Sequence, residues 1–172
     1  NEVFRVYTSP DVLGIELGGA EKRIALAAGI ADGLGYGDNT KAALITRGIT
    51  EIARLGTAMG GNFETFCGLT GIGDLIVTAQ VYTAETAGAG NLMGQGKTMQ
   101  EAMDEVQMVV ESVYSAKAAR KLAEKYEVSM PIVEQINEVL FENKSAAQAV
   151  DELMLRESKS EHSVLPWPDE TV

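Results

Sequence analysis

The chain has 172 residues, of which 45% are hydrophobic and 23% are charged, a composition typical of one folded domain with a sizeable core. Lys and Arg number 14 against 25 Asp and Glu, and the formal net charge is -11. This acidic field repels a phosphate backbone, so we exclude nucleic acid as a partner. Apolar runs stay shorter than the roughly 18 to 20 residues of a membrane span, and the first residues lack a signal-peptide pattern. We therefore expect a cytoplasmic protein.

The single cysteine and the single histidine limit the chemistry that one chain can carry. Cys67 cannot form an intrachain disulfide, which fits a reducing compartment, and we expect it to be a small buried hydrophobic residue. His162 lies in a polar segment near the end of the chain. We therefore expect neither a His-based metal site nor a His-based catalytic triad.

The first half of the chain is expected to be helical after a short extended piece at residues 4–7. We predict a helix over residues 11–30, a glycine-rich loop over 31–38 and an amphipathic helix over 40–59. Either Asp38 or Asn39 is a candidate to cap that second helix. A short helix over 63–70 follows, and the apolar run at 74–77 fits either a strand or the start of a buried helix.

The second half shows clearer helix signals. Residues 79–96 are rich in Ala, Gly and Thr, and we expect helix broken by loops there. The segment Thr98-Met-Gln-Glu101 is a capping box that starts a helix at residue 99, and Ser145-Ala-Ala-Gln148 is a second capping box. Residues 113–126 have strong helix formers, and Pro131 suits a helix start. Residues 158–172 are expected to form a polar tail.

These elements predict an all-α architecture with about seven to nine helices. The string Gly33-x-Gly35-x-Gly37 is the nearest approach to a dinucleotide fingerprint, but it lies between two predicted helices. A dinucleotide fingerprint must follow a strand and open a helix, so we reject this one.

Three polar positions stand out within glycine-rich surroundings. Lys22 follows Gly18-Gly-Ala-Glu, and its simplest interpretation is a surface lysine. The string Asp32-Gly-Leu-Gly-Tyr-Gly-Asp38 is explained by a turn between helices. Asp74, in GLTGIGDLIVT, has apolar neighbours on both sides; it is either another helix cap or a partly buried carboxylate that requires a partner.

Taken in order, four strings resemble the bacterial NAD(P)-dependent sn-glycerol-3-phosphate dehydrogenase family: PDVLGIELGGAEK, ALAAGIADGLGYGDNTKAALITRGITEIARLG, GLTGIGDLIVTA and MVVESVYSAKAA. The resemblance covers the chain from about Phe4 to about Glu157. It implies that residues 1–157 form the helical substrate-binding domain, with a fold like the C-terminal domain of 6-phosphogluconate dehydrogenase. It also implies that the family's Rossmann domain precedes this region and is absent from this chain.

The resemblance also implies a reaction and its residues. Enzymes of the family interconvert sn-glycerol 3-phosphate and dihydroxyacetone phosphate with NAD or NADP, which supplies a phospholipid precursor, and a homodimer is implied. The general acid/base falls at Lys22, and the substrate-site aspartate at Asp74. Thr78 is a candidate second substrate contact. Val109 and Glu111 correspond to positions that face the cofactor.

Three departures from the family pattern bear on function. The substrate phosphate and the cofactor meet a Ser-Arg-Asn string in the family, where this sequence has Ala84, Glu85 and Thr86. The asparagine that follows the family lysine is Arg23 here. The stretch GGAEKRIALAAG is one residue shorter than usual, and such a loss rotates the rest of a helix by about 100°. The alternative interpretation is therefore a non-catalytic helical homologue or dimerisation module that has lost the phosphate site.

Overall fold

The structure is a computed structural model that describes residues 3, 5–80, 85–106 and 111–157, with only the backbone described at residue 85 and residues 111–114. The described residues form helices and no strands, so the all-α prediction is confirmed. The α-helices are α1 (Val12–Gly18), α2 (Lys22–Gly33), α3 (Asp38–Ala58), α4 (Phe63–Phe66), α5 (Asp74–Gln80), α6 (Glu85–Gly94), α7 (Met99–Val106), α8 (Glu111–Lys125), α9 (Pro131–Phe141) and α10 (Ala146–Met154). A 3-10 turn, η1 (Gly19–Glu21), and a π-helical turn, η2 (Leu69–Gly73), join some of them.

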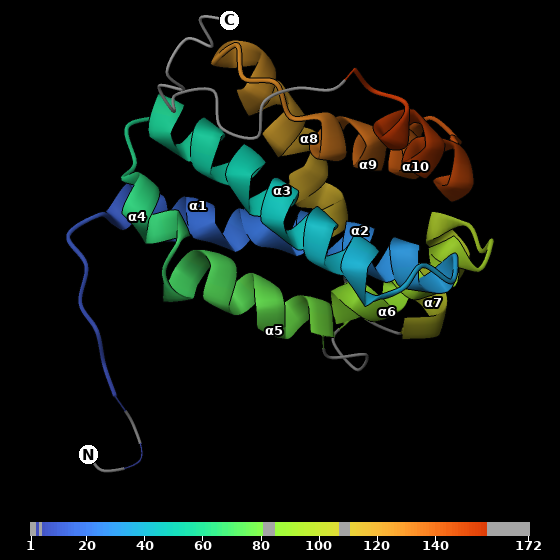
Figure 1. Cartoon of the computed structure of the whole chain (residues 1–172), viewed down its shortest axis with the longest axis horizontal. Helices are drawn as coiled ribbons and strands as arrows, with labels where there is room; N and C mark the ends of the chain where they lie inside the picture. Colours follow the sequence, from blue (N-terminus) through green and yellow to red (C-terminus); the bar gives the residue numbers. More distant parts are fainter. Residues whose placement is uncertain (1–2, 4, 81–84, 107–110, 158–172) are drawn as a thin grey trace, which may run out of the picture.

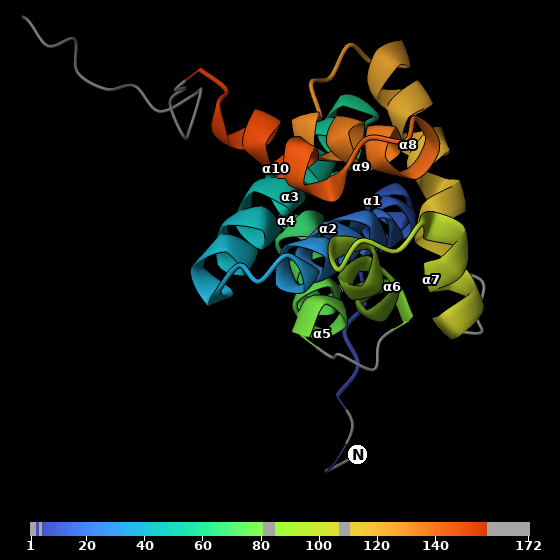
Figure 2. The same ribbon diagram turned by 90° about the vertical axis from the view of Figure 1, so that its right-hand side faces the viewer.

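Helix α2 is the centre of the molecule. It runs between α3 on one side and α5 and α6 on the other (Figure 1), and the end-on view shows helices all around it (Figure 2). Every residue from Arg23 to Ala31 is buried. A helix that is apolar on all sides belongs in the interior of a fold, which explains the continuous IALAAGIA sequence.

Helices α2 and α6 pack unusually closely, because both carry glycine along the contact. A Cβ atom added at Gly29 would lie 2.2 Å from the carbonyl oxygen of Ala87, and one added at Gly90 would lie 2.3 Å from that of Leu26. Gly33 and Gly94 repeat this arrangement one turn further on. Backbone-to-backbone contact of this kind requires residues without side chains.

The capping predictions have mixed outcomes. Thr98 Oγ1 accepts from the N–H of Glu101, and the Thr98 N–H donates to the Glu101 carboxylate at 2.8 Å, so this capping box is confirmed. Only half of the second capping box forms: Ser145 Oγ accepts from the N–H of Gln148, but the Gln148 side chain donates to Glu152. The prediction for α3 was wrong: its N-cap is Gly37, without a side-chain cap, and Asp38 is the first helical residue.

Other local predictions also need correction. Cys67 is exposed rather than buried, because it follows the last residue of the four-residue helix α4, whose Phe66 fills the core instead. Of the two alternatives left open for residues 74–77, a strand or a helix start, the structure has the helix, because they begin α5. The helix predicted over 11–30 is divided by η1, and the described residues contain ten α-helices, more than the seven to nine expected. Within the described ranges, no helix is long and apolar enough to cross a membrane.

Candidate functional site

The predicted polar site residues lie at the beginnings of two helices. Lys22 is the first residue of α2 and is half-buried, while Asp74 is the first residue of α5 and is exposed. Of the two alternatives for Asp74, the partly buried carboxylate is wrong: Asp74 is exposed at the start of α5, and the next residue, Leu75, is the one that is buried. A carboxylate is favourable there, since the N-terminal end of a helix carries partial positive charge. Thr78, one turn later, is half-buried.

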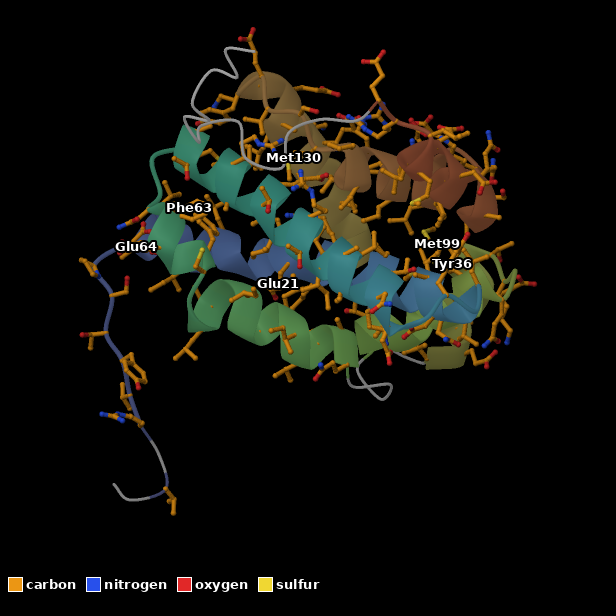
Figure 3. All side chains as sticks on the ribbon, in the orientation of Figure 1. Glu21, Tyr36, Phe63, Glu64, Met99 and Met130 are labelled. Carbon is orange, nitrogen blue, oxygen red and sulfur yellow. The ribbon has the colours of Figure 1, made fainter. Side chains whose placement is uncertain are left out.

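The side chain of Glu21 connects these two helix starts. Glu21 ends η1 and is 0% exposed, and its carboxyl group lies close enough to that of Asp74 to interact with it; Figure 3 shows Glu21 in the middle of the molecule between α3 and α5. Burial raises the pKa of Glu21 to about 8, and the neighbouring Asp74 carboxylate adds to this shift. Because Lys22 follows Glu21 directly, the contact brings the start of α2 to the start of α5.

The residue after Lys22 in α2 is a buried arginine, Arg23. Arg23 is 4% exposed, and its Nη1 donates to the carbonyl of Ser115 in α8 at 2.8 Å. Its Nε has no hydrogen-bond partner in the described part of the chain. Burial lowers the pKa of Arg23 to about 10, and Glu21 opposes that shift, so the guanidinium keeps its charge at neutral pH. Arg23 also lines a cavity of about 210 Å³ between η1, α3 and α8.

The remaining predicted residues are only partly described. Thr86 is buried in α6 with 8% of its surface exposed. Ala84 and Val109 lie outside the described residues, and for Glu85 and Glu111 only the backbone is described, at the first positions of α6 and α8. The roles expected for these residues therefore stay predictions.

Sequence reasoning singled out Lys22 and Asp74 but did not single out Glu21. One signal was present: Glu21 is an acidic residue inside a stretch of glycine, alanine and aliphatic residues, where a carboxylate has few polar neighbours. What could not be foreseen is that Glu21 points inward and Lys22 is left half-buried. Successive helical residues differ by about 100° in direction, so tertiary packing decides which of the two faces the core.

The described residues offer no group of His, Cys, Asp and Glu side chains able to hold a metal ion. They also do not fit a dinucleotide by themselves. Gly35, with φ of +83°, and Gly37 belong to the turn between α2 and α3, and that turn does not follow a strand, as a pyrophosphate-binding loop does.

Comparison with known proteins identifies the relatives of this fold. Residues 11–151 match the family model described as NAD-dependent glycerol-3-phosphate dehydrogenase C-terminus. This chain belongs to that family. Two relatives are called glycerol-3-phosphate dehydrogenase [NAD(P)+]: one from Agathobacter rectalis, 68% identical over 97% of this chain and 50% of its own length, and one from Bacillus subtilis, 58% identical over 91% of this chain and 46% of its own length.

Solved structures agree with this glycerol-3-phosphate dehydrogenase C-terminal fold. The crystal structure of glycerol-3-phosphate dehydrogenase from Coxiella burnetii is 40% identical, has a TM-score of 0.86, and is matched over 89% of this chain and 47% of its own length. The glycerol-3-phosphate dehydrogenase from Saccharomyces cerevisiae, 23% identical with a TM-score of 0.74 over 88% of this chain and 51% of its own, shares the fold. The chain thus spans about half the length of the relatives it matches.

Proposed function

We propose that this chain is the substrate half of an oxidoreductase that interconverts sn-glycerol 3-phosphate and dihydroxyacetone phosphate with NAD or NADP, and so supplies a precursor of glycerophospholipids. The reaction class is inferred from the relatives, which are called glycerol-3-phosphate dehydrogenase [NAD(P)+]. The observation that supports a site in this chain is the proximity of Glu21 to Asp74 where α2 and α5 begin, with Lys22 directly after Glu21 in the sequence. We place this enzyme in the cytoplasm as a homodimer.

In this proposal the nicotinamide cofactor would be held mainly by another domain and would supply the hydride acceptor or donor for C2 of the substrate. Lys22 takes the proton from the C2 hydroxyl in the oxidation and returns it in the reduction. Asp74, which is exposed, hydrogen-bonds the lysine or the substrate hydroxyl, and Thr78 offers a second polar contact. A positioned acid/base of this kind contributes about 10² to 10⁴ in rate.

The phosphate end of the site is where this chain departs from the family. Arginine suits phosphate because its planar fork forms two hydrogen bonds to one phosphate group. Glu85 replaces that cation with an anion, which repels phosphate. Arg23 is a candidate substitute, but its side chain is buried and its Nη1 donates to the Ser115 carbonyl. We therefore expect weak phosphate binding.

The test is to join this chain to the dinucleotide-binding half of a relative. We expect the unaltered hybrid to bind glycerol 3-phosphate at least tenfold more weakly than a variant with Ala84→Ser, Glu85→Arg and Thr86→Asn, a difference of about 1.4 kcal/mol. Equal affinity and turnover in the two hybrids would show that the charge at residue 85 does not matter.

The role of Lys22 is tested in the restored hybrid. Lys22→Met is expected to lower kcat by about a hundredfold or more, whereas Lys121→Met, on the exposed face of α8, leaves it unchanged. If the restored hybrid folds but neither binds nor converts the substrate, the non-catalytic alternative is the correct one. Sedimentation of the hybrid tests the homodimer.

A further inference from the structure

Glu21 is a buried acid without an ordinary hydrogen-bond donor. Neither of its carboxyl oxygens has a partner N–H or O–H among the described residues, although its side chain is fully buried. The group that it meets is another carboxyl, that of Asp74. Two ionised carboxylates can only accept hydrogen bonds, so a hydrogen bond between them requires that one of them carries a proton.

The surroundings of Glu21 decide which carboxyl holds this proton. Burial disfavours the charged form of Glu21, whereas Asp74 is exposed to water, where a carboxylate is well solvated. Lys22 favours the charged form of Glu21 only weakly. The cavity lined by Arg23 receives uncharged residues from α3 and α8, among them Ile52, Leu55 and Ser115, and one acid, Glu16 of α1. The proton therefore belongs on Glu21, which donates it to Asp74.

One cation opposes this arrangement. The guanidinium of Arg23 is buried nearby, interacts electrostatically with Glu21, and has an Nε–H without a partner. When Glu21 loses its proton, its attraction to Asp74 becomes repulsion and its attraction to Arg23 increases. Asp74 then loses the donor that orients it.

We propose that Glu21 is a positioning residue that shares one proton with Asp74, fixes the orientation of the Asp74 carboxylate, and limits the pair to a single negative charge. This rests on the proposed function, which gives Asp74 its place in the substrate site. A single charge matters because the substrate is a phosphate dianion, and a second carboxylate charge close to it adds repulsion. The pair acts near neutral pH, since the pKa of Glu21 is about 8.

The protonation of Glu21 is tested on this chain alone, by infrared spectroscopy of the carboxyl C=O band as pH rises from about 5 to about 9. All these measurements use a chain that carries Glu51→Gln, because Glu51 is a second buried acid with a raised pKa and would contribute its own band. We expect a protonated-acid band that persists at neutral pH, disappears around pH 8, and is absent after Glu21→Gln. With Asp74→Asn the band should be lost at lower pH. A spectrum without such a band at neutral pH, or one that Glu21→Gln leaves unchanged, overturns the proton-sharing pair.

The positioning role is tested in the restored hybrid enzyme with two variants of similar size. Glu21→Gln keeps an N–H donor for Asp74 and is expected to retain kcat within about threefold, with a rate that no longer changes through pH 8. Glu21→Leu removes the donor, and we expect at least a tenfold loss of kcat. Equal rates and unchanged pH profiles in both variants would rule out positioning. If the hybrid is inactive, the proposed function fails, while the infrared result still decides whether the proton is shared.

Discussion

At the scale of single residues, two buried glutamates carry most of the unusual electrostatics. Glu21 faces another carboxyl, whereas Glu51 of α3 accepts hydrogen bonds from the backbone N–H groups of Ile132 and Val133 at 3.0 to 3.4 Å. These N–H groups belong to the first turn of α9 and have no partner within their own helix. Glu51 therefore fastens the start of α9 to the middle of α3, at the cost of burying a carboxylate.

Glu51 is expected to make folding stability depend on pH. Burial raises its pKa to about 7, despite the opposing hydrogen bonds from α9. A folded-state pKa above the ordinary value of 4.5 means that the folded state binds the proton more tightly than the unfolded state. This stabilisation is fully present below pH 4.5 and is lost as pH rises to about 7, by up to roughly 1.4 kcal/mol per pH unit.

Glu51→Gln tests this, because glutamine keeps an oxygen to accept the two N–H groups but does not titrate in this range. Urea unfolding at several pH values should show a smaller decline of stability for the variant than for the unaltered chain between pH 4.5 and about 7. Glu51→Ala leaves both N–H groups without an acceptor, and we expect it to cost about 1 to 3 kcal/mol at every pH. Identical pH dependence of the unaltered chain and the glutamine variant would contradict this assignment.

At the scale of elements, the contact of α2 with α6 organises the fold. Its closeness comes from glycines on both helices, at 29 and 33 in α2 and at 90 and 94 in α6. A second cluster fastens α1 to α4: Asp11 accepts from the N–H groups of Gly14 and Asn62 and from the Thr65 hydroxyl. These three donors lower the pKa of Asp11, so the contribution of this cluster is present at neutral pH and is lost as pH falls.

The glycine contact leads to a prediction against intrinsic helix propensity. Alanine favours a helix over glycine by about 1 kcal/mol. Gly29→Ala is nevertheless expected to destabilise the chain by about 1 to 3 kcal/mol, because its Cβ would lie 2.2 Å from the carbonyl oxygen of Ala87. The matched control is Gly19→Ala, where no atom lies within 4 Å of the added Cβ and φ is -59°. Thermal unfolding should separate the two, and a Gly29→Ala chain as stable as the control would contradict the close packing.

At the scale of the whole molecule, the chain is a helical body built around α2, and it matches about half of its relatives' length. We expect no oxidation of glycerol 3-phosphate and no reduction of dihydroxyacetone phosphate by this chain alone, since the sequence holds no dinucleotide fingerprint between a strand and a helix. The absorbance of the reduced nicotinamide, followed with purified chain and either substrate, checks this. Turnover above that of a buffer blank would contradict it.

Sequence alone determined the helical class, most helix starts and the family resemblance. These features depend on local information: capping boxes such as Thr98 with Glu101, the Pro131 start of α9, and periodic apolar positions along α3. The candidate residues Lys22 and Asp74 came from motifs, and their catalytic roles stay predictions.

Only the tertiary structure decided which side chains enter the core. The sequence did not distinguish Glu21 from Lys22 as the buried residue, nor did it show that Cys67 is exposed or that the 11–30 segment is divided at η1. Each of these depends on the direction of a side chain or on the path of the backbone relative to helices distant in sequence. A rotation of about 100° separates neighbouring helical residues, so burial is set by the packing of α2 against α3, α5 and α8, which local sequence patterns do not encode.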